Sequence, residues 1–211
     1  MNNKKAIAEK LLQINAIKLS VEKPFTWASG WQSPIYCDNR KILSFPLIRD
    51  FIKAEICAVI AEFFAQTDMV AGVATAGIPW GAMAADLLKL PFIYVRPKPK
   101  EHGLTNQIEG FYKPGMKAVV IEDLISTGKS SLQVINLLKS SGLEVDGLIS
   151  IFNYGFKAAE EAFKSSDINF KSLTDYDTLI ALAIEKEILS SKEEKTLLDW
   201  RENPAEWNRM H

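Results

Sequence analysis

Histidine and cysteine are scarce in this chain of 211 residues, and their scarcity limits the chemistry open to it. The two histidines are His102 and His211, so we expect neither a histidine-based metal site nor a Ser-His-Asp triad. The two cysteines, Cys37 and Cys57, are too few for a disulfide framework and lack metal-ligand spacing. This usage predicts a cytoplasmic protein.

Long apolar runs and an excess of one charge are also missing. No stretch has the length of a membrane span, and the N-terminus is amphipathic rather than signal-like. The formal net charge is -1, whereas a nucleic-acid binder needs a basic surplus. We therefore expect a soluble protein that binds neither membrane nor nucleic acid. With 47% hydrophobic residues, the chain can bury one sizeable core, which predicts a single domain over residues 1–211.

Hydrophobic segments alternate between strand and helix patterns, which predicts an α/β fold with a mostly parallel central sheet flanked by helices. Strands are predicted at residues 69–73, 92–95, 118–121, 145–152 and 170–172. Among the helices, one is predicted over residues 4–16, and Pro46 opens a long one that Ser44 caps. Capping-box signatures at 174–177 and 191–194 predict the starts of the last two.

The most informative stretch is Ala118–Ser131, AVVIEDLISTGKSS, in which a buried strand leads through polar residues into a helix. We place its motif on the strand-to-helix turn. Ligands of open α/β sheets bind at the carboxyl ends of strands, and backbone N–H groups at a helix start suit a phosphate. Carboxylates such as Glu122 and Asp123 accept hydrogen bonds from sugar hydroxyls or approach a metal ion. The stretch therefore predicts a site for a phosphorylated sugar.

Two other interpretations of this stretch are weaker. Helix capping explains one polar residue, but not two adjacent acids followed by five hydroxyl or glycine positions. A Walker A motif needs a glycine five residues before Gly128, where Asp123 stands.

Residues 20–40 are rich in aromatic side chains around Ser29-Gly30, a pattern typical of a hairpin. Dense aromatics usually pack in a core, but they could also form a hood in which Tyr36 stacks on a planar base.

Residues 74–79 are open to two interpretations as well. They form either a tight strand-to-helix connection or a backbone that approaches a pyrophosphate.

The stretch 96–110, RPKPKEHGLTNQIEG, is long for a loop and combines prolines with basic residues. A solvated loop is one interpretation. Its position beside the predicted sugar-phosphate site favours a mobile lid that closes over an anionic leaving group, excludes water and stabilises the developing charge.

Three motifs carry a resemblance to a known family. The acid-acid-apolar-apolar-Ser-Thr-Gly pattern at 122–128 resembles the phosphoribosyl pyrophosphate (PRPP) motif of the type I phosphoribosyltransferases. The pattern Phe-Thr-x-x-Ser-Gly-x-x-Ser-Pro-x-Tyr at 25–36 resembles the orotate phosphoribosyltransferases in particular. The pattern Arg-x-x-x-Lys-x-His-Gly at 96–103 resembles the lid loop of the family. The resemblance implies a pentosyltransferase that combines PRPP and orotate, with Mg2+, to give orotidine 5-monophosphate and pyrophosphate in pyrimidine synthesis.

The resemblance also implies roles for individual residues. Glu122 and Asp123 would hold the ribose hydroxyls, the loop 124–130 would hold the 5-phosphate, and Ser126 would also touch orotate. The lid would enter the neighbouring subunit's site in a homodimer. There Lys100 and His102 would act in catalysis. The substrate-binding set is Arg96, Glu122, Asp123, Leu124, Ile125, Ser126, Thr127, Gly128, Lys129, Ser130 and Tyr36.

The chain departs from the family pattern at basic positions. Members often have lysines where this chain has Ala28, Ala76 and Pro97, and an arginine near residues 153–154. These losses fall on pyrophosphate and orotate recognition and leave the 5-phosphate loop untouched. A phosphoribosyltransferase for another nucleobase therefore stays an alternative, as does a non-catalytic regulator that senses PRPP or a nucleotide.

Overall fold

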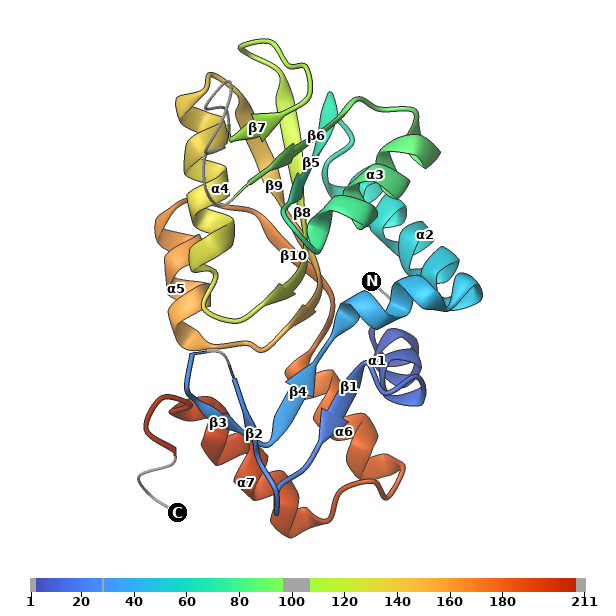
Figure 1. The fold of residues 1–211 in the computed structure, drawn as a ribbon, viewed down its shortest axis with the longest axis vertical. Coiled ribbons are helices and arrows are strands. Elements are labelled where there is room, and N and C mark those ends of the chain that lie inside the picture. The colour runs from blue at the N-terminus through green and yellow to red at the C-terminus, as the bar shows by residue number, and fades with distance from the viewer. Residues whose placement is uncertain (1–2, 28, 97–106, 208–211) are drawn as a thin grey trace.

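The computed structural model describes residues 3–27, 29–96 and 107–207, and its centre is a six-stranded sheet (Figure 1). The strand order is β10-β9-β8-β5-β6-β7. The strands are β5 (Met69–Val73), β6 (Phe92–Val95), β7 (Ile108–Glu109), β8 (Lys117–Ile125), β9 (Glu144–Asn153) and β10 (Phe170–Asp175). Neighbouring strands run parallel except β7, which is antiparallel to β6. The predicted fold class, an α/β fold with a mostly parallel sheet, is confirmed.

Helices cover both faces of this sheet (Figure 1). They are α2 (Pro46–Phe63), α3 (Gly77–Leu88), α4 (Lys129–Ser140) and α5 (Lys157–Ser165). Side chains alternate along a strand, so Ala118 and Val120 of β8 pack in a cluster with α4 and α5, whereas Val119 and Ile121 pack with α2 and α3. Among the residues that the structure describes, no helix is both long and apolar enough to cross a membrane.

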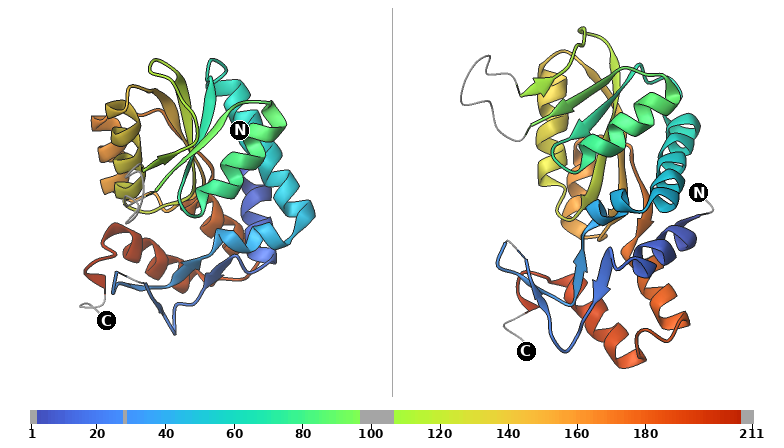
Figure 2. Two further views of the ribbon diagram at one scale, coloured as in Figure 1. Left: turned by 45° about the horizontal axis from the view of Figure 1, so that its top comes forward. Right: turned by 45° about the vertical axis from the view of Figure 1, so that its right-hand side comes forward.

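The two ends of the chain meet beyond the carboxyl end of the sheet. The N-terminal elements are α1 (Lys4–Gln13), β1 (Ile17–Leu19), β2 (Phe25–Thr26), β3 (Gln32–Ser33), β4 (Ile35–Cys37) and the 3-10 helix η1 (Asn39–Ser44). The C-terminal elements are α6 (Tyr176–Glu185) and α7 (Ser191–Glu202). Strands β2 and β3 form the predicted hairpin, and β1 pairs with β4. Figure 2 shows both strand pairs beside α6 and α7 at one end of the molecule.

A cluster of aromatic rings packs the predicted hood, residues 20–40, against α7 and against the segment that follows β9. Trp200 is fully buried, and its Nε1 donates a hydrogen bond to the backbone oxygen of Gln32 at 3.0 Å. Its ring centroid lies 5.6 Å from that of Trp27 and 5.5 Å from that of Phe156. The packing interpretation of the aromatic segment is thus confirmed for Trp27. Tyr36 is different, because it is 38% exposed.

We expect Trp200→Ala to lower the free energy of unfolding by about 3–5 kcal/mol, the range for removing a buried tryptophan. The cavity would lie where the hood joins α7, and the oxygen of Gln32 would lose its donor. Urea unfolding followed by circular dichroism measures the loss. Leu198→Ala on the exposed side of the same helix is the control, with an expected change within about 0.5 kcal/mol. Equal midpoints for the two variants would contradict this view of the hood.

The predicted capping boxes at 174–177 and 191–194 locate α6 and α7, but each is wrong by one residue. In α6 the cap is Asp175, whose side chain accepts a hydrogen bond from the backbone N–H three residues on. In α7 the cap is Ser190, which forms the capping box with Glu193. Each true cap has another residue capable of capping beside it, so composition alone does not choose between the two positions.

Two other predicted helix ends also differ. Pro46 opens α2 as predicted, but Ser44 ends η1 and does not cap the helix, since Phe45 occupies the cap position without a side-chain hydrogen bond. Helix α1 stops at Gln13 rather than at residue 16. Asn15 takes a left-handed conformation, with φ of 51°, that turns the chain into β1.

Candidate active site

The site lies where the chain connections diverge. Strand β5 leads through α3 to β6 on one side of the sheet, whereas β8 leads through α4 to β9 on the other. Such a switch point leaves a crevice at the carboxyl ends of the two central strands. A cavity of about 350 Å3 lies there, lined by Cys37, Asp38, Arg40, Thr75, Ala76, Asp123 and Leu124.

Both predicted carboxylates lie on β8, not on the turn that follows it, because the strand continues to Ile125. Successive side chains of a strand point to opposite faces. Asp123 lines the cavity, while Glu122 is only 7% exposed, and its Oε1 accepts a hydrogen bond from the Asp123 backbone N–H at 3.0 Å. The structure therefore brings Asp123 to the cavity and places Glu122 in support of it.

The predicted phosphate loop connects β8 to the N-terminus of α4. Gly128 is the cap residue with φ of 72°, and a Cβ there would lie 2.7 Å from the ring of Phe163. No side chain caps the helix, and the first N–H groups of an α-helix have no intrahelical partner. Thr127, Lys129 and Ser130 are exposed around these groups. The loop can therefore bind an anion, as its sequence predicts.

The connection from β5 to α3 confirms one interpretation of residues 74–79, the tight turn, whereas the approach to a pyrophosphate stays a prediction. Thr75 and Ala76 line the same cavity as Asp123, which is the position a pyrophosphate-binding backbone needs. The connection is also tight, because a Cβ on Gly77 would lie 2.3 Å from the backbone oxygen of Ile121. Only glycine fits this approach of α3 to β8.

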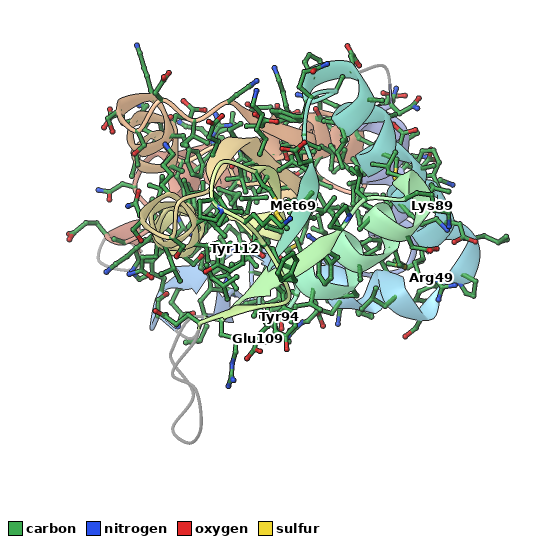
Figure 3. All side chains as sticks on the ribbon, turned by 90° about the horizontal axis from the view of Figure 1, so that it is seen from above. Arg49, Met69, Lys89, Tyr94, Glu109 and Tyr112 are labelled. Atoms are coloured by element: carbon green, nitrogen blue, oxygen red, sulfur yellow. The ribbon has the colours of Figure 1, made fainter. Side chains whose placement is uncertain are left out.

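The base of the predicted lid is an antiparallel ladder between β6 and β7, where Tyr94 pairs with Glu109 (Figure 3). Arg96 donates its backbone N–H to the oxygen of Gln107 at 2.8 Å, and its Nη1 lies 3.6 Å from Oε1 of Glu109. Its side chain lines a second cavity of about 260 Å3 together with Ser130, not the cavity of Asp123. The predicted catalytic residues Lys100 and His102 lie outside the described residues.

Burial dominates the electrostatics of the acidic pair. It raises the pKa of Glu122 well above the ordinary value, and the negative charge of Asp123 adds to the effect. Burial also raises the pKa of Asp123, against the opposing influences of a hydrogen bond with Glu122 and the positive charge of Arg40. Burial and the nearby acids Asp123 and Asp38 raise the pKa of Cys37 too, so its thiol stays protonated and does not serve as a nucleophile.

We expect Glu122→Gln to raise the free energy of unfolding at about pH 8. A carboxyl whose pKa is raised by folding binds more protons in the folded state, so stability falls as the pH rises from its ordinary value of 4.5 through the raised pKa. Glutamine does not ionise, so the variant lacks this loss of stability at high pH. Its advantage over the wild type should shrink as the pH falls toward 4.5.

Denaturant unfolding of the ligand-free protein at several pH values measures this difference. Glu161→Gln, on the exposed side of α5, controls for the loss of a surface charge. A variant whose advantage grew on acidification would contradict the assignment of Glu122 as a buried, destabilising acid.

No group of three or more histidine, cysteine or acidic side chains that could hold a metal ion occurs among the residues that the structure describes. Asp123 and Asp38 are the carboxylates that line the central cavity. Magnesium commonly binds one or two carboxylates together with substrate phosphates, and this pair fits that mode.

Sequence reasoning missed the three residues that follow Tyr36 and Cys37. Asp38 and Arg40 line the cavity and pair through Oδ1 and Nε at 2.9 Å. Asn39 is buried, and its Nδ2 donates to the backbone oxygen of Asp123 at 2.7 Å. The available signal was an Asp-Asn-Arg triplet directly after the predicted hood strand. Tyr36 itself is exposed, with its ring 5.6 Å from that of Phe25, and its role in stacking stays a prediction.

The fold and the site define a type I phosphoribosyltransferase. The sequence model of the Phosphoribosyl transferase domain matches residues 42–177, which hold β5, the connection at residues 74–79 and the 122–130 motif. The chain belongs to the orotate phosphoribosyltransferase family of pentosyltransferases, as the motifs indicate.

Named relatives cover nearly the whole chain. The orotate phosphoribosyltransferase of Bacteroides thetaiotaomicron is 52% identical over 207 residues, which is 98% of both chains. That of Bacillus subtilis is 52% identical over 201 residues, or 95% of this chain and 93% of the other. The crystal structure of orotate phosphoribosyltransferase from Aeropyrum pernix superposes with a TM-score of 0.75 at 29% identity, covering 87% of this chain and 99% of that one.

Proposed function

We propose that this chain transfers the phosphoribosyl group of PRPP to orotate, giving orotidine 5-monophosphate and pyrophosphate in pyrimidine synthesis. One observation carries the proposal. The carboxylate of Asp123 shares a cavity with the Thr75–Ala76 loop, and β8 leads directly from it to the uncapped N-terminus of α4. The carboxylate suits the hydroxyls of the ribose, and the two backbone turns suit the pyrophosphate and the 5-phosphate, so the site matches the three parts of PRPP.

We assign a task to each part of the site. Asp123 accepts hydrogen bonds from the ribose hydroxyls, and Glu122 fixes the backbone N–H beside it. The loop 124–130 binds the 5-phosphate, so the sugar is held at both ends. Carbon 1 gains cationic character as the pyrophosphate leaves, and a fixed sugar lets the orotate nitrogen meet it in the reactive orientation.

Mg2+ completes the site in this proposal. The ion would supply positive charge that neutralises the leaving pyrophosphate. Asp123 and Asp38 are the residues of the cavity that would hold it, and the remaining ligands would come from substrate and water. The negative charge of these two carboxylates also favours a hydrated cation in the cavity.

The lid acts across a homodimer in this proposal. Arg96 anchors one end of the lid but lines the cavity that contains Ser130 of α4, and Asp123 does not line that cavity. A lid that leaves its own subunit would deliver Lys100 and His102 to the partner's pyrophosphate. The reducing cytoplasm, indicated by the cysteine usage, is the expected location.

Lys100→Ala is expected to lower kcat by about 100- to 1,000-fold, the range for removing one preorganised stabiliser of developing charge. Binding of ribose 5-phosphate should change little, because that contact belongs to residues 124–130. Steady-state kinetics and calorimetric binding measure the two quantities. Lys113→Ala, an exposed lysine outside the lid, controls for lost positive charge. An unchanged kcat would remove the lid from the mechanism.

A panel of bases tests the proposed substrate against the alternatives. The protein is incubated with PRPP, Mg2+ and orotate, uracil, adenine or guanine in turn, and nucleotides are separated by chromatography. We expect orotidine 5-monophosphate alone. A nucleotide formed only from another base would support the alternative of a phosphoribosyltransferase for that base. PRPP binding without any product would support the alternative of a non-catalytic sensor.

A further inference from the structure

The central cavity contains one cationic side chain among the described residues that line it, and sequence reasoning gave that residue no role. The chain has Ala76 where relatives of the family often have a lysine beside the pyrophosphate. Arg40 lines the same cavity as Ala76, although it comes from η1 and not from the β5–α3 loop. We propose that Arg40 binds the pyrophosphate group of PRPP and so supplies the cation that this loop lacks.

Asp38 orients the guanidinium of Arg40 for this task. Arg40 Nε donates to Asp38 Oδ1 at 2.9 Å, and the backbone N–H of Lys41 donates to the backbone oxygen of Asp38, which fixes the turn. Nη1 and Nη2 have no hydrogen-bond partner among the residues that the structure describes. The side chain is 64% exposed, so a ligand can reach these two nitrogens. An arginine held at Nε presents a planar fork that suits phosphate oxygens.

The charges of the cavity favour such a group. Its remaining ionisable groups beside Cys37 are the carboxylates of Asp38 and Asp123, which would repel a pyrophosphate. The positive charge of Arg40 offsets that repulsion. Arg40 thus supplies positive charge to a cavity whose other charged groups are carboxylates.

A purely structural role for Arg40 makes a different prediction. If Arg40 only balanced Asp123, its removal would weaken ribose binding at least as much as pyrophosphate binding. If Arg40 contacts the leaving group, the loss should fall on pyrophosphate. It should also be repaired by a cation placed at position 76, which lines the same cavity.

The test measures pyrophosphate and ribose 5-phosphate binding, each with Mg2+, by calorimetry on the full chain, and it rests on the proposed function because PRPP combines the two ligands. We expect Arg40→Ala to weaken pyrophosphate binding by about 10- to 100-fold, the range for a lost hydrogen bond between charged groups. Ribose 5-phosphate binding should change by less than about threefold. Compared with Arg40→Ala alone, the double variant Arg40→Ala/Ala76→Lys should recover part of the pyrophosphate affinity and have a lower KM for PRPP. Lys23→Ala, an exposed lysine of the hood segment that does not line the cavity, is the control.

Equal losses for the two ligands, or unchanged pyrophosphate affinity in Arg40→Ala, would overturn the assignment. Circular dichroism of each variant identifies a loss that comes from unfolding, and Arg40→Lys, which keeps the charge, should then retain more pyrophosphate affinity than Arg40→Ala. A wild type without transferase activity but with Arg40-dependent pyrophosphate binding would refute the proposed function and leave the role of Arg40 standing. An active wild type whose pyrophosphate binding does not depend on Arg40 would support the proposed function and refute the role of Arg40.

Discussion

Asp123→Asn is expected to lower kcat/KM for PRPP by about 10- to 100-fold, the effect of losing charged acceptors for hydrogen bonds. Asparagine keeps the shape of the side chain, so the fold should persist. Its amide group carries no negative charge and presents an N–H2 donor in place of one carboxylate oxygen. Both the ribose hydroxyls and a bound magnesium ion would lose a ligand, whereas orotate would not. The KM for PRPP should therefore rise and kcat should fall, with little change in the KM for orotate.

Initial rates over a grid of PRPP and orotate concentrations measure these parameters. Asp199→Asn, an exposed residue of α7, controls for the loss of one negative charge. Thermal unfolding of Asp123→Asn should show no loss of stability, because the wild-type carboxyl is one whose pKa burial has raised. Wild-type kinetics in this variant would remove Asp123 from the site.

Gly77→Ala is expected to abolish most PRPP binding and to lower the free energy of unfolding by about 1–3 kcal/mol, the usual cost of overpacking. The added Cβ would lie 2.3 Å from the backbone oxygen of Ile121 and 3.5 Å from Cα of Glu122. Neither atom belongs to a side chain that could rotate away. The start of α3 would have to move from β8, and the loop of Thr75 and Ala76 would move with it.

Gly81→Ala in the same helix is the matched control for this effect. Its Cβ would lie 2.7 Å from Cε2 of Phe92, the end of a partly buried side chain that can shift. Alanine is also the better helix former by about 1 kcal/mol. We expect Gly81→Ala to keep most activity, as judged by unfolding midpoints and PRPP affinity. Equal activity in the two variants would show that the approach of α3 to β8 does not position the site.

The sequence predicted those features that depend on local patterns. The β-branched run before Glu122 identified β8, and the polar run after it identified the anion-binding start of α4, because strand, turn and helix are adjacent in the chain. The end of β8 was placed too early, since Glu122 and Asp123 looked like turn residues. Pairing with β9 continues through Ile125 and keeps both acids in the strand.

Features that depend on distant contacts were beyond reach. Asn39 bonds to Asp123 across 84 positions, and Trp200 bonds to Gln32 across 168. No local periodicity marks such partners. For the same reason Arg40 escaped notice, because its importance depends on the fold that brings η1 and the β5–α3 connection to one cavity. The lack of a lysine at position 76 was visible in the sequence, but its replacement was visible only in the fold.

The most direct test of the proposed reaction follows the absorbance of orotate after the purified protein is mixed with orotate, PRPP and Mg2+, while pyrophosphate is measured in parallel. We predict that absorbance falls only when all components are present, and that one pyrophosphate appears for each orotate consumed. Stable absorbance in the complete mixture, with PRPP still bound by the protein, would contradict the transfer to orotate.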